Sequence, residues 1–252
     1  MKIKIAFILV VCLQMILCVT PQTRIEKANE KDPSYQYKMG LYYLNSSQLD
    51  LSIKHLKVSL SLNPQNHLAL NALGLAYSMK GNFDESVKYY TECLKINPAL
   101  TEAQNNLGIA YQELGLLAKA EEFFIAASLD TQYSSREHSF YNLARLYFIQ
   151  NKLQDALFQV QKSLEIKQDF FLALNHEGMI FSKLGQLDNA VRSFEKAFEI
   201  IPDDIDLNFN LAEAYFNNRQ FEKAKQLFNT LYLQSIDMEM KKKIEDYLRK
   251  IK

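Results

Sequence analysis

Small, aromatic and apolar residues return at fixed spacing along most of this chain. A leucine or methionine, then a small residue, then a tyrosine three positions later recur every 34 residues, as in Leu73-Gly74-Tyr77 and Leu107-Gly108-Tyr111. Further along each period come a small residue, a large apolar residue and often a proline. A period of this length predicts stacked helix-turn-helix units, with helices at about positions 2–14 and 18–30 of each unit.

Three positions of the repeat carry the packing. Position 8 is small in every unit: Gly40, Gly74, Gly108, Ala144, Gly178 and Ala212. Position 20 is also small: Ser52, Ser86, Ala120, Ala156, Ala190 and Ala224. Position 24 is large and apolar: Leu56, Tyr90, Phe124, Val160, Phe194 and Phe228. We therefore expect the two helices of a unit to approach closely at positions 8 and 20, where a side chain larger than methyl would push them apart.

Helix ends are marked by residues with special backbone chemistry. Asp32-Pro33 provides an N-cap and a proline at the first helical position. Glycines follow the first helix of three units, at Gly81, Gly115 and Gly185. Prolines follow the second helix, at Pro64, Pro98 and Pro202, because proline cannot continue a helix.

The pattern resembles the tetratricopeptide repeat (TPR). The resemblance implies an all-α fold, a right-handed superhelix (solenoid) of six helix-turn-helix repeats followed by a capping helix. The repeats are expected at 33–66, 67–100, 101–134, 137–170, 171–204 and 205–238, and the capping helix at 239–252. Ile244, Leu248 and Ile251 lie on one face of that last helix. Solenoids of this kind bind other proteins and rarely catalyse reactions.

The N-terminal residues are typical of an export signal. Lys2 and Lys4 precede an apolar run, so residues 1–18 are expected to be a signal peptide and residues 19–32 a polar tether. Cys18 follows a sequence similar to a lipobox, although Leu17 stands where a small residue is usual. A lipidated Cys18 implies an exported lipoprotein of the outer membrane, held to the bilayer by its acyl chains. If Cys18 is only part of the apolar run, the protein is expected to be periplasmic.

Composition argues against several functions. The formal net charge is zero, so no nucleic-acid partner is expected. The four histidines lack metal-ligand spacing, and no nucleophile elbow or phosphate-binding loop is present. We therefore expect no catalytic residue, no metal and no cofactor, and we expect that the protein is not an enzyme. Cys93 occupies a small-residue position of its repeat and is expected to be buried.

The first helices of the repeats are expected to line a protein-binding groove. Its candidate residues are Tyr37, Leu41, Asn71, Leu75, Asn105, Ile109, Gln112, Tyr141, Arg145 and Phe148. Position 6 adds a possible ladder of side-chain amides, Asn106, Asn142 and Asn210. Apolar residues mixed with amides suit an amphipathic helix or an extended peptide. The alternative is that part of this stripe packs against neighbouring first helices.

The spacing between the third and fourth repeats is 36 residues instead of 34. Tyr133 is expected to fill the wider junction, and Asp130 and Arg136 to cap or pair across it. The sequence here contains Ala127, Ser128, Asp130, Thr131, Tyr133, Arg136, Phe140, Asn142 and Leu143. This block resembles the type IV pilus pilotins (the PilF/PilW and Tgl group), which are six-repeat TPR lipoproteins.

The resemblance implies a non-catalytic scaffold that binds secretin subunits and promotes their outer-membrane localisation and assembly. The blurred lipobox and the regular fifth and sixth repeats depart from that group. Two alternatives remain open at this point. One is another envelope TPR adaptor of an outer-membrane or cell-wall assembly complex, and the other is a regulatory subunit of an enzyme.

Overall fold

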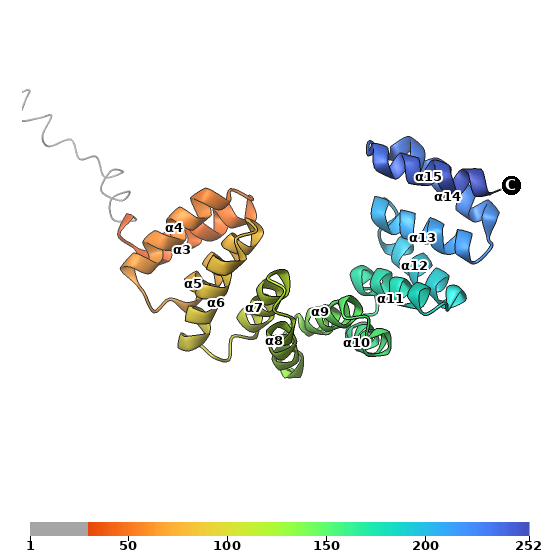
Figure 1. Ribbon diagram of the computed structural model, residues 1–252. Coiled ribbons are helices and arrows are strands. Elements are labelled where there is room, and N and C mark those ends of the chain that lie inside the picture. The colour runs from red at the N-terminus through yellow and green to blue at the C-terminus, as the bar shows by residue number, and fades with distance from the viewer. Residues whose placement is uncertain (1–29, 252) are drawn as a thin grey trace, which may run out of the picture. The chain divides into compact units, whose positions relative to one another are not determined.

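The computed structural model describes residues 30–251, and within them the chain forms α-helices and no strands (Figure 1). The helices are α3 (Pro33–Asn45), α4 (Leu49–Leu62), α5 (His67–Met79), α6 (Phe83–Ile96), α7 (Thr101–Glu113), α8 (Leu117–Leu129), α9 (Arg136–Ile149), α10 (Leu153–Ile166), α11 (Phe171–Lys183), α12 (Leu187–Ile200), α13 (Ile205–Asn217), α14 (Phe221–Gln234) and α15 (Met238–Lys250). The expectation of an all-α repeat fold is confirmed. The first helix begins at position 1, one residue earlier than expected, in every repeat but the fourth, where α9 begins two residues earlier than expected, at Arg136. The last helix ends at Lys250.

The helices belong to two compact units. The first ends at Ala110 and the second begins at Tyr111, so the boundary lies inside α7. In each unit, a helix packs chiefly against the helices next to it in sequence, such as α3 against α4 and α9 against α10.

Every turn inside a repeat has the same geometry. The middle residue of each three-residue turn has a positive φ, between 55° and 74°: Ser47, Gly81, Gly115, Asn151, Gly185 and Arg219. The next residue donates its amide to a carbonyl in the last turn of the helix, as from Asn82 N to Tyr77 O at 2.9 Å. These bonds satisfy carbonyls that the helix end leaves free. The glycine punctuation is confirmed, and three repeats adopt the left-handed conformation without glycine.

The close approach of paired helices is confirmed at position 8. A Cβ added to Gly74 would lie 2.7 Å from the ring of Tyr90, and one added to Gly178 would lie 2.7 Å from Phe194. The position 24 residues are all fully or almost fully buried. Even a methyl group would therefore clash at these two glycines, which is a tighter limit than the sequence suggested. Alanine occurs at position 8 where the partner is Val160 or Phe228.

Serines at position 20 add a hydrogen bond to this contact. The Ser52 hydroxyl donates to the Gly40 carbonyl at 2.8 Å, and the Ser86 hydroxyl donates to the Gly74 carbonyl at 2.9 Å. Both serines are fully buried, so the bond satisfies a hydroxyl that would otherwise be costly to bury. Small size is thus only part of what position 20 provides in these repeats.

The connection between α8 and α9 spans residues 130–135, two residues more than the connections between other repeats. The Asp130 carboxylate accepts a hydrogen bond from the Gln132 amide at 2.9 Å, which fixes a turn inside the connection. Tyr133 is half-buried, and the Arg136 guanidinium lies over the Phe140 ring, 5.4 Å from its centroid. Three of the residues that resemble the pilotins, Asp130, Thr131 and Tyr133, lie in this longer connection, and the others lie in α8 and α9.

Helix α15 covers the end of the second unit, as expected of a cap. Ile244 is fully buried, and Leu248 and Ile251 pack against the same apolar cluster as Phe228 and Leu231. The Tyr247 hydroxyl donates to the Glu213 carboxylate at 2.6 Å. The basic residues lie mostly on the solvated faces of the helix.

Candidate functional site

In each unit, we call the face formed by the first helices of the repeats the inner face. The inner face of the first unit is aliphatic. Position 9 of its first helices carries Leu41, Leu75 and Ile109, all half-buried. Tyr37 and Leu41 also pack against the cluster of Leu56, Ala69, Ala72 and Leu73, so these two candidate groove residues contribute to packing between repeats. The remaining exposed parts of this row form an apolar stripe.

Polar groups flank that stripe. The Asn71 side chain is buried and donates to the Glu102 carboxylate at 3.2 Å, and Asn105 is buried as well. Burial, and secondarily the charge of Glu102, raises the pKa of Tyr37. The amides of this unit are therefore held within the protein, and Asn71 is partnered to a carboxylate.

Aromatic rings gather on the inner face of the second unit. The rings of Tyr141 and Phe148 lie edge-on to His176, with centroids 5.8 and 4.9 Å away. Phe170 packs against Tyr141 at 5.4 Å and stacks on His138 at 4.7 Å. Tyr141 and Phe148 also pack against the buried cluster that contains Ala173 and Ile180. The candidate residues of α9 are thus brought together, partly as core and partly as surface.

Two cations lie on these rings. The Arg145 guanidinium lies 5.8 Å from the Tyr141 centroid, and the Lys183 ammonium lies 4.3 Å from the Phe148 centroid. Neither cation belongs to an ion pair found among residues 30–251. This leaves uncompensated positive charge on an aromatic surface.

His176 is the buried titratable group of this face. Burial is the main reason that its pKa falls to about 4, and the positive charge of Arg145 lowers it further, against a backbone hydrogen bond at Ala144. The imidazole is therefore neutral at physiological pH. It is a structural part of the aromatic cluster, and one of its ring nitrogens has no hydrogen-bond partner.

A hollow of about 200 Å³ is lined by residues of α9, α11, α12 and α13. Its lining residues are Phe148, Met179, Ser182, Lys183, Phe194, Asn210, Glu213, Ala214 and Asn217. Most of them occupy positions 9, 12 and 13 of their repeats, which lie on the first helix and are the positions of the groove residues Arg145 (position 9) and Phe148 (position 12) or next to them. Met179, Lys183 and Glu213 were not among the residues expected in the groove, which came from the first four repeats. The same positions in the fifth and sixth repeats identify all three.

Part of the proposed amide ladder is buried or hydrogen-bonded within the protein. The Asn210 side chain donates to Asn175 at 3.1 Å, and Asn142 is buried. Asn106 is half-buried. Gln112 is buried, and its carbonyl oxygen has no hydrogen-bond partner. These amides lie at the expected positions on the first helices, but the amide of Asn210 is directed to a neighbouring repeat.

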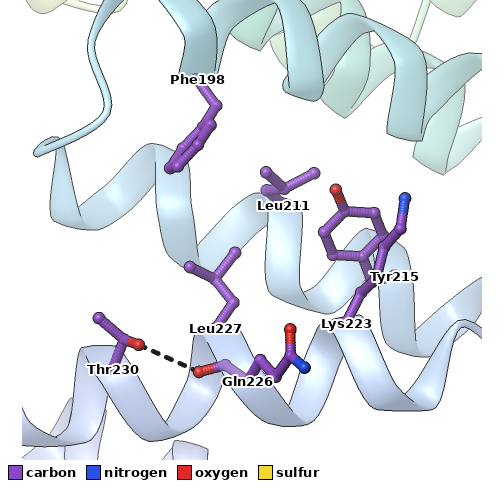
Figure 2. A pocket seen from close by; sticks show the side chains of 7 residues that line it. All are labelled: Phe198, Leu211, Tyr215, Lys223, Gln226, Leu227 and Thr230. Carbon is purple, nitrogen blue, oxygen red and sulfur yellow. Dashed lines mark hydrogen bonds between the residues drawn. The ribbon is translucent and has the colours of Figure 1, made fainter.

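A second hollow, of about 390 Å³, lies among α12, α13 and α14, where Phe198, Leu211 and Leu227 face one another (Figure 2). The Tyr215 hydroxyl and the Lys223 ammonium both donate to Glu195, at 2.8 and 3.1 Å. Burial opposes ionisation of Glu195, but these two hydrogen bonds and the charge of Lys223 lower its pKa overall. The charged groups at this hollow therefore satisfy each other.

Other reactive groups are few in the described part of the chain. Burial raises the pKa of Cys93 to about 11, and its thiol donates to the His67 carbonyl at 3.1 Å, so this cysteine is a buried packing residue as expected. Between residues 30 and 251, no group of three or more acidic, histidine or cysteine side chains is arranged to hold a metal ion. None of the helices in that range is both long and apolar enough to span a bilayer. Cys12, Cys18, the signal and most of the tether lie outside the described residues.

Comparison with protein families matches the tetratricopeptide repeat at residues 67–100, 101–128 and 183–234. Together with the helix pairs, these matches define the class: an all-α protein of stacked helical repeats. The chain is built from tetratricopeptide repeats.

The fold is similar to several solved structures. PilF of Pseudomonas aeruginosa is 16% identical with a TM-score of 0.76, and the match covers 87% of this chain and 99% of PilF. PilW, described as a widely conserved type IV pilus biogenesis factor, is 18% identical with a TM-score of 0.77. The match covers 83% of this chain and 97% of PilW. A chain of the Cut9–Hcn1 assembly of the APC/C is 17% identical with a TM-score of 0.75. The match covers 88% of this chain and 43% of that chain. At these identities the likeness shows the fold alone.

One curated relative matches a much smaller part of this chain than these structures do. The CTR9 homolog of Arabidopsis thaliana is 30% identical over 103 residues, which is 39% of this chain. The match spans only 9% of the length of that protein.

Proposed function

We propose that this protein is a pilotin-like factor of the bacterial envelope, which binds secretin subunits and promotes their outer-membrane localisation and assembly for type IV pili. The coarser statement, a repeat scaffold for protein–protein interaction, follows from the tetratricopeptide repeats. The pilotin proposal rests on how much of the PilF and PilW chains this protein matches. The match extends over 99% of PilF and 97% of PilW, so the array of repeats corresponds along the whole of those chains.

Two further observations support this proposal. The pilotin-like block from Ala127 to Leu143 contains the longer connection between the third and fourth repeats, at residues 130–135. Cys18 is placed for lipidation in the sequence, which would locate the protein at the periplasmic face of the outer membrane. A match of similar TM-score to the Cut9–Hcn1 assembly means that the fold also suits the alternative, which is another envelope TPR adaptor or a regulatory subunit of an enzyme.

The experiment compares secretin multimers in wild-type cells and in a clean deletion of the gene. We expect the deletion to contain secretin monomers in place of heat-resistant multimers and to lack surface pili. Leu75→Asp with Ile109→Asp should reproduce this loss, because burying an unpaired charge against a partner costs several kcal/mol. Leu62→Asp, on the exposed surface of α4, is the matched control and should keep the multimers.

The anchor is tested separately. If Cys18 is lipidated, mass spectrometry of the purified protein shows an acylated peptide that begins at Cys18, and Cys18→Ala no longer partitions into membranes. Normal multimers in the deletion strain would defeat the pilotin proposal and favour another envelope adaptor. An intact or unmodified N-terminus would instead remove only the lipoprotein part.

A further inference from the structure

The inner face of α9 and α11 presents two positive charges without counter-ions. The Arg145 and Lys183 side chains lie over Tyr141 and Phe148, and no carboxylate within residues 30–251 lies within ion-pair distance of either. A cation over an aromatic ring is held in place and still attracts an anion. Lys162 and Lys223 of the same unit, by contrast, have carboxylate partners at 2.7 and 3.1 Å.

The hollow beside Lys183 offers an apolar surface next to this charge. Phe148 and Met179 provide apolar walls, and Ser182 and Asn217 provide polar groups at its edge. Its own carboxylate, Glu213, accepts the Tyr247 hydroxyl at 2.6 Å and does not pair with Lys183. Within residues 30–251, the face therefore combines unfilled apolar volume with two cations that form no ion pair.

The hollow at α12–α14 lacks this combination. Its cation, Lys223, already pairs with Glu195, and Tyr215 donates to the same carboxylate. An acidic group on a ligand would therefore add little to its binding affinity there. The two hollows thus differ in the charge that a partner must bring.

We propose that the face formed by α9, α11 and α13 binds an acidic peptide segment of the partner, with an apolar side chain in the hollow and carboxylates against Arg145 and Lys183. This inference rests on the proposed function, in that a protein partner binds, and it names the chemistry of the segment. Charge complementarity selects the occupant, because a neutral or basic segment would leave both cations uncompensated. The effect of Arg145 on the neighbouring His176 is consistent with positive potential at this face.

The test begins with selection from a random displayed peptide library on the immobilised full chain. We expect enriched peptides to carry Asp or Glu next to Leu, Phe or Met. A synthetic peptide of the enriched sequence should bind wild type at least about tenfold tighter than its Asn/Gln counterpart, and more weakly as salt rises. Arg145→Glu with Lys183→Glu should weaken its binding by at least about tenfold in fluorescence polarisation.

Lys95→Glu with Lys225→Glu is the matched control, since both lysines are exposed on second helices of their repeats, and it should bind as wild type does. If charge reversal disturbs the fold in circular dichroism, Arg145→Gln with Lys183→Gln replaces it. No enrichment, enriched peptides without acidic residues, or unchanged binding by a folded variant of this pair would overturn the inference. Secretin multimers that depend on the gene would still support the proposed function in that case.

Discussion

The inner faces of the two units use the same repeat positions for different chemistry. Position 9 carries Leu41, Leu75 and Ile109 in the first unit, but Arg145, Met179 and Glu213 in the second. The first face is an aliphatic stripe, and the second is an aromatic surface with unpaired charge. The two faces therefore offer different chemistry to the segment of a partner that binds at each.

The scaffold beneath both faces is the same. Gly74 lies against Tyr90 in the first unit, and Gly178 lies against Phe194 in the second, with no room for a Cβ at either. Positions that hold the helix pairs together therefore remain fixed, while positions that face outward vary. The repeat pattern therefore determines the fold, whereas the binding chemistry depends on the outward-facing residues of each unit.

The first prediction tests the shared scaffold and has the largest expected effect. Gly74→Leu should destabilise the first unit, and Gly178→Leu the second, because each side chain would overlap a buried ring. Overpacking of this kind costs about 1–3 kcal/mol or more. Thermal melting followed by circular dichroism gives the size of the effect, and hydrogen exchange shows which unit opens.

Met79→Leu is the control for the first unit, because this residue lies on the same helix and is half exposed. It should leave the melting temperature unchanged. A strong effect of Gly74→Leu with none of Gly178→Leu would break the comparison, because it would mean that only one unit depends on the close approach.

The fold was largely predictable from the sequence because steric rules repeat. Glycine or alanine at position 8 and a large side chain at position 24 appear in every repeat, and a sequence pattern reveals such a requirement directly. The turns at Ser47 and Arg219 were less visible. Their residues do not mark a left-handed backbone, yet φ is 55° and 59°, because the hydrogen bonds that end the helix require it.

The candidate site was predictable only in part. The repeat frame located Tyr141, Arg145 and Phe148 correctly on first helices, since position within a helix follows from the period. It does not reveal which side chains already satisfy one another. That Lys223 is paired and Lys183 is not depends on distances between repeats, which no local pattern specifies.

The second prediction concerns pH and separates the two units. The pKa of His176 is about 4 in the folded protein, against about 6.5 in an unfolded chain. Because the folded pKa is the lower one, its contribution is fully present above pH 6.5 and is lost as pH falls toward 4. The loss should reach about 3 kcal/mol in the free energy of unfolding of the second unit.

His176→Asn is the matched variant, because asparagine occupies the same repeat position at Asn106 and Asn142. Urea unfolding between pH 7 and pH 4, with hydrogen exchange to resolve the units, checks the prediction. The variant should lose less stability in the second unit than wild type does. An equal pH response of wild type and variant would mean that the buried imidazole does not distinguish the units.

The last prediction concerns a small difference within the shared scaffold. Position 20 is Ser86 in the first unit, where the hydroxyl donates to Gly74, and Ala190 in the second, opposite Gly178. Ser86→Ala removes one buried hydrogen bond and should lower the free energy of unfolding by about 1 kcal/mol. Ala190→Ser offers the same bond to the Gly178 carbonyl and should raise the free energy of unfolding by about 0.5 kcal/mol.

Urea unfolding measures both changes, and hydrogen exchange should locate the first at α5–α6 and the second at α11–α12. Ala120→Ser is not a useful comparison, because α7 crosses the boundary between the units. If Ser86→Ala has no effect, the serine is present only because it is small, and the units share position 20 fully. If Ala190→Ser destabilises the protein, the second unit lacks room for the hydroxyl, because Phe194 fills the contact differently from Tyr90.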